Sequence, residues 1–340
     1  MKRILTALIP TIGFLLILLF VVRLRTNRPP PLVEITRPLL GTTVTIKAVD
    51  TGTSATVLAV EQAFEEMWRI DSLMTDYTTT SELVSIERQE GSDWRTVSDD
   101  LFSVIRRSQE IASLSHGAFD ITIGAIKQLW DFTSTTVPHL PPPERITEQL
   151  QFIGYHRISL DENNHRIRVP SGTVLDLGGV ATGYAVDRAI EILQKADIHN
   201  TLIDAGGDIR TMGRRPDGTP WVIAIQHPRE ERLITIRDVG LSSVATSGDY
   251  QQYFEIGGHR YHHIFDPATG YPVTHSISAT VWAETTIDAD ILSTTVFVLG
   301  PEEGITLIEQ LGRAEALIFY VDNGTVKYRM SRGMIGKVDV

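Results

Sequence analysis

An uncharged apolar run near the start of the chain places the strongest constraint on how this sequence can fold. It covers residues 4–22 and has basic residues on both sides. As a helix rising ~1.5 Å per residue, it would span roughly 28 Å, close to the hydrocarbon thickness of a bilayer. The run does not end in the small residues of a cleaved signal peptide. We therefore predict an uncleaved transmembrane helix, whose orientation the flanking charges do not decide.

The segment after this run has the composition of an extended stalk. It covers residues 26–31 and ends in three consecutive prolines from Pro29. The chain therefore divides into an anchor and Pro-rich stalk at residues 1–33 and one domain at residues 34–340. With 42% hydrophobic and 21% charged residues, the sequence as a whole has the composition of a globular protein, which fits this second part.

Charge and cysteine content exclude several classes of function. The formal net charge is −11, and no acidic residue precedes Glu34, so the domain itself is more acidic than the whole chain. Such a domain is poorly suited to bind nucleic acid. The sequence has no cysteine, which excludes disulfides, thiolate metal sites, cysteine nucleophiles and a lipid-modified cysteine anchor.

Hydrophobic periodicity predicts both helices and strands. Apolar residues recur at helical spacing from about Ser54 to Met74, and Ser98, followed by two aspartates, has the pattern of a helix N-cap. Because the predicted strands cluster instead of alternating with helices, we predict an α+β fold with mixed or antiparallel sheets and packed helices. The other predicted helices are residues 182–195, 289–299 and 302–311, and the predicted strands are residues 41–46, 201–203, 221–226, 233–237, 261–265, 276–283 and 314–321.

Five dense segments combine glycine, acidic, hydroxyl and aromatic residues. The dinucleotide-binding, P-loop, nucleophile-elbow and zinc-protease motifs are absent, so the usual routes to hydride transfer, ATP hydrolysis, ester hydrolysis and zinc proteolysis lose support. Each segment taken alone is compatible with an ordinary turn or a solvated surface. The segments are SHGAFDITIG from Ser115, DLGGVATGYAVD from Asp176, IDAGGD from Ile203, HIFDPATGYP from His263 and ADILST from Ala289.

Together and in this order, the five segments resemble the ApbE family of flavin transferases over essentially the whole chain from Leu40 onward. Leu40-Gly41-Thr42 and residues 73–83 match as well. The resemblance implies the ApbE-like fold and an FAD:protein FMN transferase. Such an enzyme cleaves FAD, attaches FMN through a phosphoester bond to a Thr or Ser hydroxyl of an acceptor protein, and releases AMP. The resemblance also implies Mg²⁺ dependence.

Two candidate metal ligands follow from spacing. Asp290 and Thr294 are four residues apart on a predicted helix, which places a carboxylate and a hydroxyl on one face. Both offer the hard oxygen atoms that Mg²⁺ prefers. The resemblance implies the backbone carbonyl of Gly179 as a third protein ligand.

The resemblance also implies a set of residues that contact FAD. Tyr77 and Phe119 would offer apolar faces to a ring, although an ordinary core position is a serious alternative for Phe119. Asp120 and Asp176 would accept hydrogen bonds from the nucleotide, since carboxylates among apolar residues are rarely buried without a partner. The implied positions are Leu40, Tyr77, Ala118, Phe119, Asp120, Asp176, Thr182 and Ile264.

His263 is the candidate general base. A neutral imidazole near pH 7 accepts a hydroxyl proton without a large pKa shift. An alternative is a metal cluster of His259, His262 and His263, but on a strand His262 would point away from the other two. We therefore favour the role of general base for His263 over a histidine metal cluster.

Two positions depart from the family pattern. Thr182 stands where the family usually has Lys, so a charged contact to the nucleotide is lost, and Leu40 replaces the usual Met. Neither change removes a candidate metal ligand or the candidate base. We therefore expect an active enzyme.

Two other functions are compatible with the same residues. Water in place of a protein hydroxyl would make the protein an FAD pyrophosphatase that yields FMN and AMP, and a non-catalytic, membrane-tethered flavin-binding protein is the second alternative. For the transferase we expect acceptor proteins flavinylated on Thr or Ser, such as membrane redox proteins, as partners. We expect the N-terminal helix to lie in the inner membrane and the catalytic domain on its periplasmic side.

Overall fold

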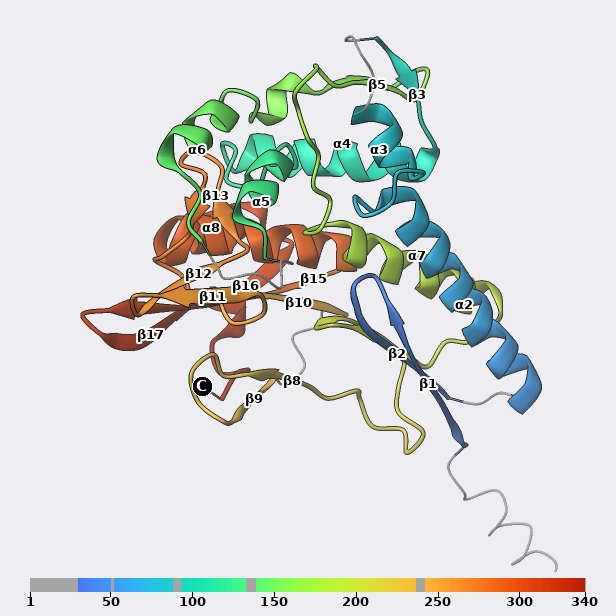
Figure 1. Ribbon diagram of the computed structural model, residues 1–340. Coiled ribbons are helices and arrows are strands. Elements are labelled where there is room, and N and C mark those ends of the chain that lie inside the picture. The colour runs from blue at the N-terminus through green and yellow to red at the C-terminus, as the bar shows by residue number, and fades with distance from the viewer. Residues whose placement is uncertain (1–29, 50–51, 88–92, 133–138, 237–241, 340) are drawn as a thin grey trace, which may run out of the picture.

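One large antiparallel sheet forms the centre of the fold (Figure 1). The computed structural model describes residues 30–49, 52–87, 93–132, 139–236 and 242–339, so the predicted transmembrane helix lies outside the described residues. The sheet has eight strands in the order β1-β2-β6-β7-β10-β15-β16-β17. Their bounds are β1 (Leu32–Leu39), β2 (Thr42–Val49), β6 (Thr201–Ala205), β7 (Asp208–Met212), β10 (Ser243–Gly248), β15 (Ser278–Ala283), β16 (Ala314–Asp322) and β17 (Thr325–Met330).

Smaller antiparallel sheets surround the large one. The β8–β9 hairpin lies below it in Figure 1, whereas the β11–β12 and β13–β14 pairs lie nearer the helices. The bounds are β3 (Arg95–Thr96), β4 (Ser159–Asp161), β5 (Arg166–Arg168), β8 (Ile223–Gln226), β9 (Leu233–Ile236), β11 (Tyr253–Ile256), β12 (His259–His262), β13 (Phe265–Asp266) and β14 (Tyr271–Pro272). The predicted α+β class with antiparallel pairing describes the fold correctly.

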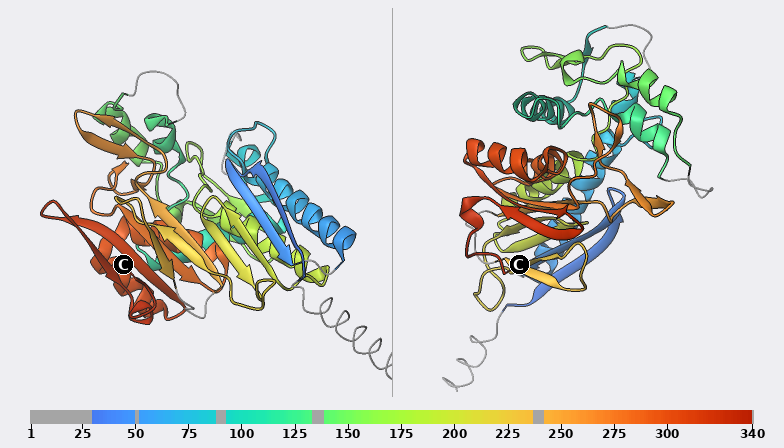
Figure 2. Two further views of the ribbon diagram at one scale, coloured as in Figure 1. Left: turned by 90° about the horizontal axis from the view of Figure 1, so that it is seen from below. Right: turned by 90° about the vertical axis from the view of Figure 1, so that its left-hand side faces the viewer.

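Three helices cover one face of the large sheet, and the other helices form an outer layer over them (Figures 1 and 2). The covering helices are α2 (Thr53–Met74), α7 (Ala181–Lys195) and α8 (Thr286–Leu311). The outer layer contains α3 (Glu82–Glu87), α4 (Asp99–Leu114), α5 (Gly124–Trp130), α6 (Pro143–Leu150) and the short 3₁₀ turn η1 (Tyr155–Arg157); a second 3₁₀ turn, η2 (Arg332–Met334), follows β17.

The helix predictions from the sequence hold with local corrections. The Ser98 hydroxyl accepts a hydrogen bond from the Leu101 N–H at 3.3 Å, as the N-cap pattern predicted. The two helices predicted at residues 289–299 and 302–311 form one element, α8, which is broken at Gly300, where φ is +80°, just before Pro301. A proline inside a helix removes a backbone donor, which explains the break.

The predicted strand at residues 261–265 is interrupted in the structure. β12 ends at His262 and β13 begins at Phe265. Between them, the Ile264 N–H donates to Nδ1 of His262 at 3.2 Å, and Nε2 of His262 lies 2.7 Å from the Val273 carbonyl. The His263 N–H still donates to the Gln252 carbonyl at 3.2 Å, but the Ile264 N–H bonds to a side chain, so the backbone pairing of the hairpin ends there.

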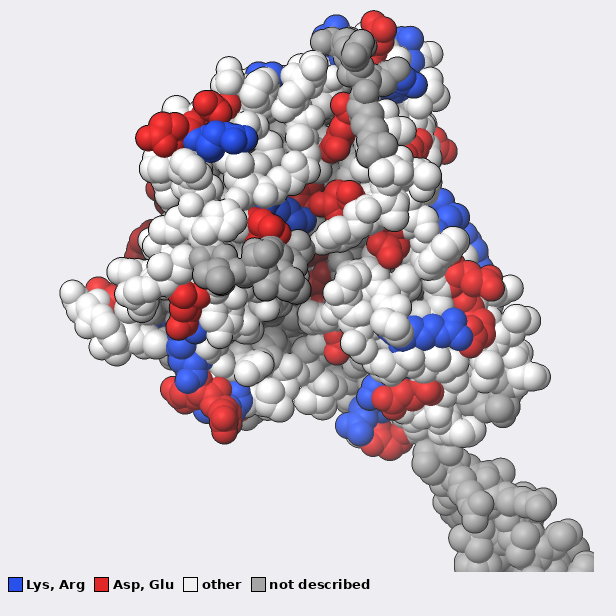
Figure 3. Space-filling view, viewed as in Figure 1, with Lys and Arg blue, Asp and Glu red and all other residues white. Residues whose placement is uncertain are grey.

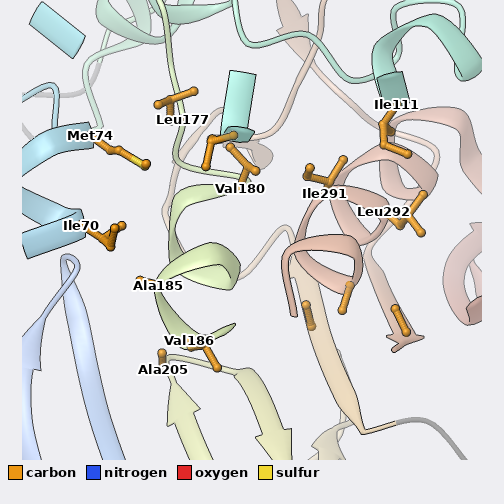
Figure 4. Packing of buried hydrophobic residues seen from close by; sticks show 14 of the residues in the cluster. Ile70, Met74, Ile111, Leu177, Val180, Ala185, Val186, Ala205, Ile291 and Leu292 are labelled. Atoms are coloured by element: carbon orange, nitrogen blue, oxygen red, sulfur yellow. The ribbon is translucent and has the colours of Figure 1, made fainter. Parts of the chain in front are cut away.

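The main hydrophobic core lies between the sheet and the three covering helices. Fully burying a Val, Leu, Ile, Phe or Met side chain stabilises the folded state by about 1.5–3 kcal/mol. Packing in this layer therefore fixes the positions of the helices. α8 is long and apolar enough to cross a membrane by length and composition, but 61% of its most apolar window is buried inside the fold. Figure 4 shows side chains that meet in this core, among them Ile70, Met74, Val180, Ala185, Val186, Ile291 and Leu292.

The start of α7 packs unusually closely against α8. A Cβ added at Gly183 would lie 2.5 Å from the Thr286 carbonyl oxygen and 2.8 Å from Cβ of Asp290. Asp187, one turn further along α7, accepts hydrogen bonds from the Thr286 and Ile287 N–H groups at 2.9 and 3.0 Å. A carboxylate at a helix N-terminus also interacts favourably with the helix dipole. These contacts set the separation of the two helices.

Gly183→Ala should therefore destabilise the fold. The added methyl group would force α7 and α8 apart, at a cost of about 1–3 kcal/mol for overpacking, which outweighs the better helix propensity of alanine. The free energy of unfolding in urea measures this cost. Gly52→Ala is the matched control, because no atom lies within 4 Å of a Cβ added there. Equal stability of the two variants would contradict the prediction.

Candidate active site

A deep cleft of about 640 Å³ opens beside the three covering helices (Figure 3). The turn between β1 and β2, the C-terminal end of α2, the loop before α7 and one face of α8 all contribute to its wall. Every site residue predicted from the sequence lines this cleft. These residues are Leu40, Tyr77, Ala118, Phe119, Asp120, Asp176, Gly179, Thr182, His263, Ile264, Asp290 and Thr294.

Leu40 reaches the cleft through a strained turn. Leu40 and Gly41 have φ values of +55° and +68°, as in the two-residue turn that best joins twisted antiparallel strands. Positive φ is uncommon for leucine. A second, more open hollow of about 690 Å³ adjoins the cleft at this turn and is also lined by Trp68 and Asp71. Of the predicted site residues, only Leu40 lines this second hollow, so we place the chemistry in the first.

The predicted metal ligands come together at one point of the cleft. Asp290 and Thr294 lie on the same face of α8. A Cβ at Gly179 would lie 3.2 Å from Oγ1 of Thr294, so the Gly179 backbone is next to that hydroxyl. Ser247 on β10 lies 3.1 Å from the Thr294 hydroxyl and positions it. The structure therefore brings the Thr294 hydroxyl next to the Gly179 backbone, with Asp290 one turn before Thr294 on α8.

The carboxylate of Asp290 is poorly compensated by the protein. Its side chain is buried, and the Gly183 N–H donates a hydrogen bond to Oδ2 at 2.9 Å. Burial raises the pKa of Asp290, and the Asp187 charge adds to this effect. Burial likewise raises the pKa of the nearby Asp208, with further contributions from Asp290 and Asp204. Hard oxygen donors whose negative charge lacks compensation fit a divalent cation such as Mg²⁺.

The other wall of the cleft carries the residues assigned to FAD. Phe119 is buried, and a Cβ added at Gly179 would lie 3.4 Å from its ring. The Phe119 side chain therefore belongs both to the core and to the wall of the cleft. Tyr77 is 72% exposed at the rim and free to cover a bound ring. Ala181 and Thr182, the first two residues of α7, line the cleft, so the positive end of the helix dipole faces it, and the Gly183 N–H of the same turn donates to Asp290.

The two aspartates of this wall differ in their partners. Oδ1 of Asp120 accepts hydrogen bonds from the N–H and the hydroxyl of Thr122 at 2.9 and 2.7 Å, and burial raises the pKa of Asp120. Asp120 therefore braces its own loop. Oδ1 of Asp176 accepts from Nζ of Lys127 and from the Gly178 N–H, both at 2.9 Å.

His263 is half-buried and lies where the chain bends into the cleft. Its Nδ1 is 3.3 Å from the Gln252 carbonyl oxygen, so Nδ1–H donates there and Nε2 keeps its lone pair. Burial lowers the pKa of His263 to about 4. The imidazole is therefore neutral at every pH well above 4, and it is a weaker base than a free imidazole.

The alternative histidine cluster does not form. His259 is exposed on β12, whereas both ring nitrogens of His262 are engaged with backbone groups in the interior. Among the residues that the structure describes, no group of three or more His, Cys, Asp or Glu side chains is arranged to hold a metal ion.

Several residues of the site were missed from the sequence. Asp187 holds the start of α8, Ser247 holds Thr294, and Lys127 bonds to Asp176. Asp187 and Asp208 stand inside the quoted motifs, and an acidic residue at the end of each glycine-containing segment was the available signal. Ser247 and Lys127 come from other segments and reach the site only through tertiary packing.

Comparisons with known proteins point to one family. The model of the ApbE family matches residues 40–318. The FAD:protein FMN transferase of Haemophilus influenzae is 33% identical, with 84% of this chain and 86% of that protein covered. The protein of the same name from Vibrio cholerae is 31% identical, with 90% and 92% covered.

Solved structures are similar as well. The ApbE protein of Thermotoga maritima superimposes with a TM-score of 0.79 at 35% identity, covering 88% of this chain and 97% of that chain. The apo form of the Pseudomonas stutzeri flavinyl transferase ApbE gives a TM-score of 0.80 at 29% identity, covering 92% and 98%. The likeness thus extends over nearly the whole described chain.

Proposed function

This chain belongs to the ApbE family and is an FAD:protein FMN transferase, and from this premise we propose that its cleft binds FAD with the pyrophosphate beside Asp290 and Thr294. We further propose that these two side chains and the Gly179 carbonyl hold Mg²⁺. The acceptors are proteins that present a Thr or Ser hydroxyl, such as membrane redox proteins.

The donor set around Asp290 is the observation that supports the proposal most. A buried carboxylate with one backbone donor is costly unless a cation faces it. The Thr294 hydroxyl lies one turn further along α8, next to the Gly179 backbone, whose carbonyl would supply the third oxygen donor. Bound Mg²⁺ would neutralise the phosphate charge that opposes attack by a hydroxyl.

The remaining residues accept the proton of the acceptor hydroxyl and hold the substrate in position. The acceptor hydroxyl attacks the phosphorus of the FMN half, the bond from that phosphorus to the AMP oxygen breaks, and AMP leaves. Nε2 of His263 takes the hydroxyl proton, since its lone pair is free when Nδ1–H bonds to Gln252. The first turn of α7 and the residues opposite hold the dinucleotide.

Asp290→Ala should remain folded, bind Mg²⁺ poorly and transfer FMN very slowly, because the central metal ligand is lost. Thr294→Val should be impaired in the same direction by losing one oxygen donor. The measurement is in-gel flavin fluorescence of a candidate acceptor after incubation with FAD and limiting Mg²⁺, together with AMP release.

The same assay separates the alternative function. Release of FMN and AMP with no fluorescence on any acceptor would indicate a pyrophosphatase instead. Wild-type transfer by Asp290→Ala at limiting Mg²⁺ would remove that residue from the site. Glu191→Ala, on the part of α7 remote from the cleft, is a control that should transfer normally.

His263→Ala should keep nearly normal binding of FAD and Mg²⁺ but lose transfer by ~10²–10⁴-fold, the usual contribution of a general base. In the wild type, any acidic limb that His263 causes should lie near pH 4, because the base is protonated only as the pH falls through its folded pKa. The variant should lack this limb. Single-turnover rates between pH 4 and pH 8 measure both effects.

A purely structural role of His263 predicts another result. A histidine that only braces the bend after β12 would, when replaced, lower thermal stability and FAD affinity together. If His263→Ala binds FAD normally and transfers FMN at the wild-type rate, the base lies elsewhere, and Asp266 is the next candidate.

We also propose that residues 4–22 anchor the protein in the inner membrane and that the catalytic domain lies on the periplasmic side. The apolar run and the stalk that follows it support this arrangement. Alkaline phosphatase fused after Val340 should then be active, because this reporter works only outside the cytoplasm. An inactive fusion together with an active cytoplasmic reporter at the same position would reverse the topology.

A further inference from the structure

The cleft is strongly acidic for a site that accepts a diphosphate. Its lining in the described part of the chain includes one lysine, Lys127, and no arginine. Figure 3 shows acidic side chains around the hollow. FAD brings two negative charges on its diphosphate, so every fixed cation here has a large effect on binding. The carboxyl groups of the lining are Asp71, Asp76, Asp120, Asp176, Asp208 and Asp290.

Lys127 is held at the wall by acidic residues from two other segments. It projects from α5, with Nζ 2.9 Å from Oδ1 of Asp176 and 3.7 Å from Oδ2 of Asp76. Its side chain is 28% exposed. Burial opposes its charge, but the charges of Asp176 and Asp76 outweigh burial and raise the pKa of Lys127. The ammonium group is therefore charged at every physiological pH.

The ammonium group retains donors for a ligand. It has three N–H groups, and Asp176 is the one hydrogen-bond acceptor that it meets among the described residues, because 3.7 Å to Asp76 is too long for a hydrogen bond. A Cβ at Gly178 would lie 3.6 Å from Nζ, so the group stands next to the loop that leads into α7. Its charge also reaches His263, where it adds to burial in lowering the pKa of the imidazole.

We propose that Lys127 contacts the diphosphate of FAD and provides the positive charge that Thr182 does not. This rests on the proposed function, in which FAD occupies the cleft. Thr182 lines the same cleft, in the first turn of α7, four residues after the Gly178 that adjoins Lys127. The cation thus comes from α5 instead of from α7. Lys127 acts as a positioning residue, which binds substrate and does not transfer the proton.

A neutral replacement tests the charge itself. Lys127→Gln should weaken FAD binding by ~10–100-fold, the usual effect of losing a hydrogen bond to a charged group. The binding of riboflavin, which has no phosphate, should be unchanged, and this also reports that the cleft is intact. Flavin fluorescence titrations of the full chain without acceptor measure both affinities. In the transfer assay, KM for FAD should rise far more than kcat falls.

Moving the charge is the sharper test. Lys127→Gln/Thr182→Lys should recover most of the lost FAD affinity, and Lys127→Arg should retain it. A lysine that serves only the fold predicts that riboflavin and FAD affinities fall together, that the unfolding temperature drops, and that Thr182→Lys restores nothing. Any of these three results would overturn the proposal. If the wild-type chain binds riboflavin but not FAD, the proposed function fails first, and the role of Lys127 fails with it.

Discussion

The contact between the first turn of α7 and the first turns of α8 is the constraint on which the active site depends. Gly183 has no side chain, so its N–H reaches the Asp290 carboxylate directly, while Asp187 bonds to the start of α8. Gly179 precedes α7, and Asp290 and Thr294 lie on α8, so the separation of these helices decides whether the three donors meet. The site is therefore as rigid as the helix pair that carries it.

The cleft concentrates carboxyl groups at a cost to the fold. Asp290 and Asp208 are poorly compensated within the protein, and burial is the main reason why their pKa values are raised. Uncompensated charges of this kind destabilise a protein unless a ligand supplies the opposite charge. These two carboxylates have no evident role in stability, and a site that binds a cation accounts for them. By contrast, Asp187 has Arg210 and two backbone donors, and it stabilises the fold itself.

A feature of the fold or of the site could be predicted from the sequence when the interaction behind it is local in the chain. The spacing of Asp290 and Thr294 placed them correctly because helix geometry repeats over one turn, and amphipathic periodicity predicted α2 for the same reason. β10 was missed, since its sequence SVATSG is small and polar although the strand is central and largely buried. The bend before His263 depends on side-chain bonds of His262, and the Lys127–Asp176 pair joins residues 49 positions apart. No sequence pattern predicts such contacts.

The acidic cleft has a thermodynamic consequence for how its ligands bind. In the proposed binding mode, the carboxylates around Asp290 would repel the diphosphate of FAD when no cation is bound, and Lys127 would offset part of this repulsion. A divalent cation at Asp290 and Thr294 would turn the repulsion into attraction and so raise the affinity for FAD. By linkage, FAD must then raise the affinity for the cation by the same factor. The buried Asp290 binds a proton more readily than a free aspartate, and that proton competes with the cation. Metal and FAD binding should therefore strengthen together as the pH rises through the raised pKa of Asp290.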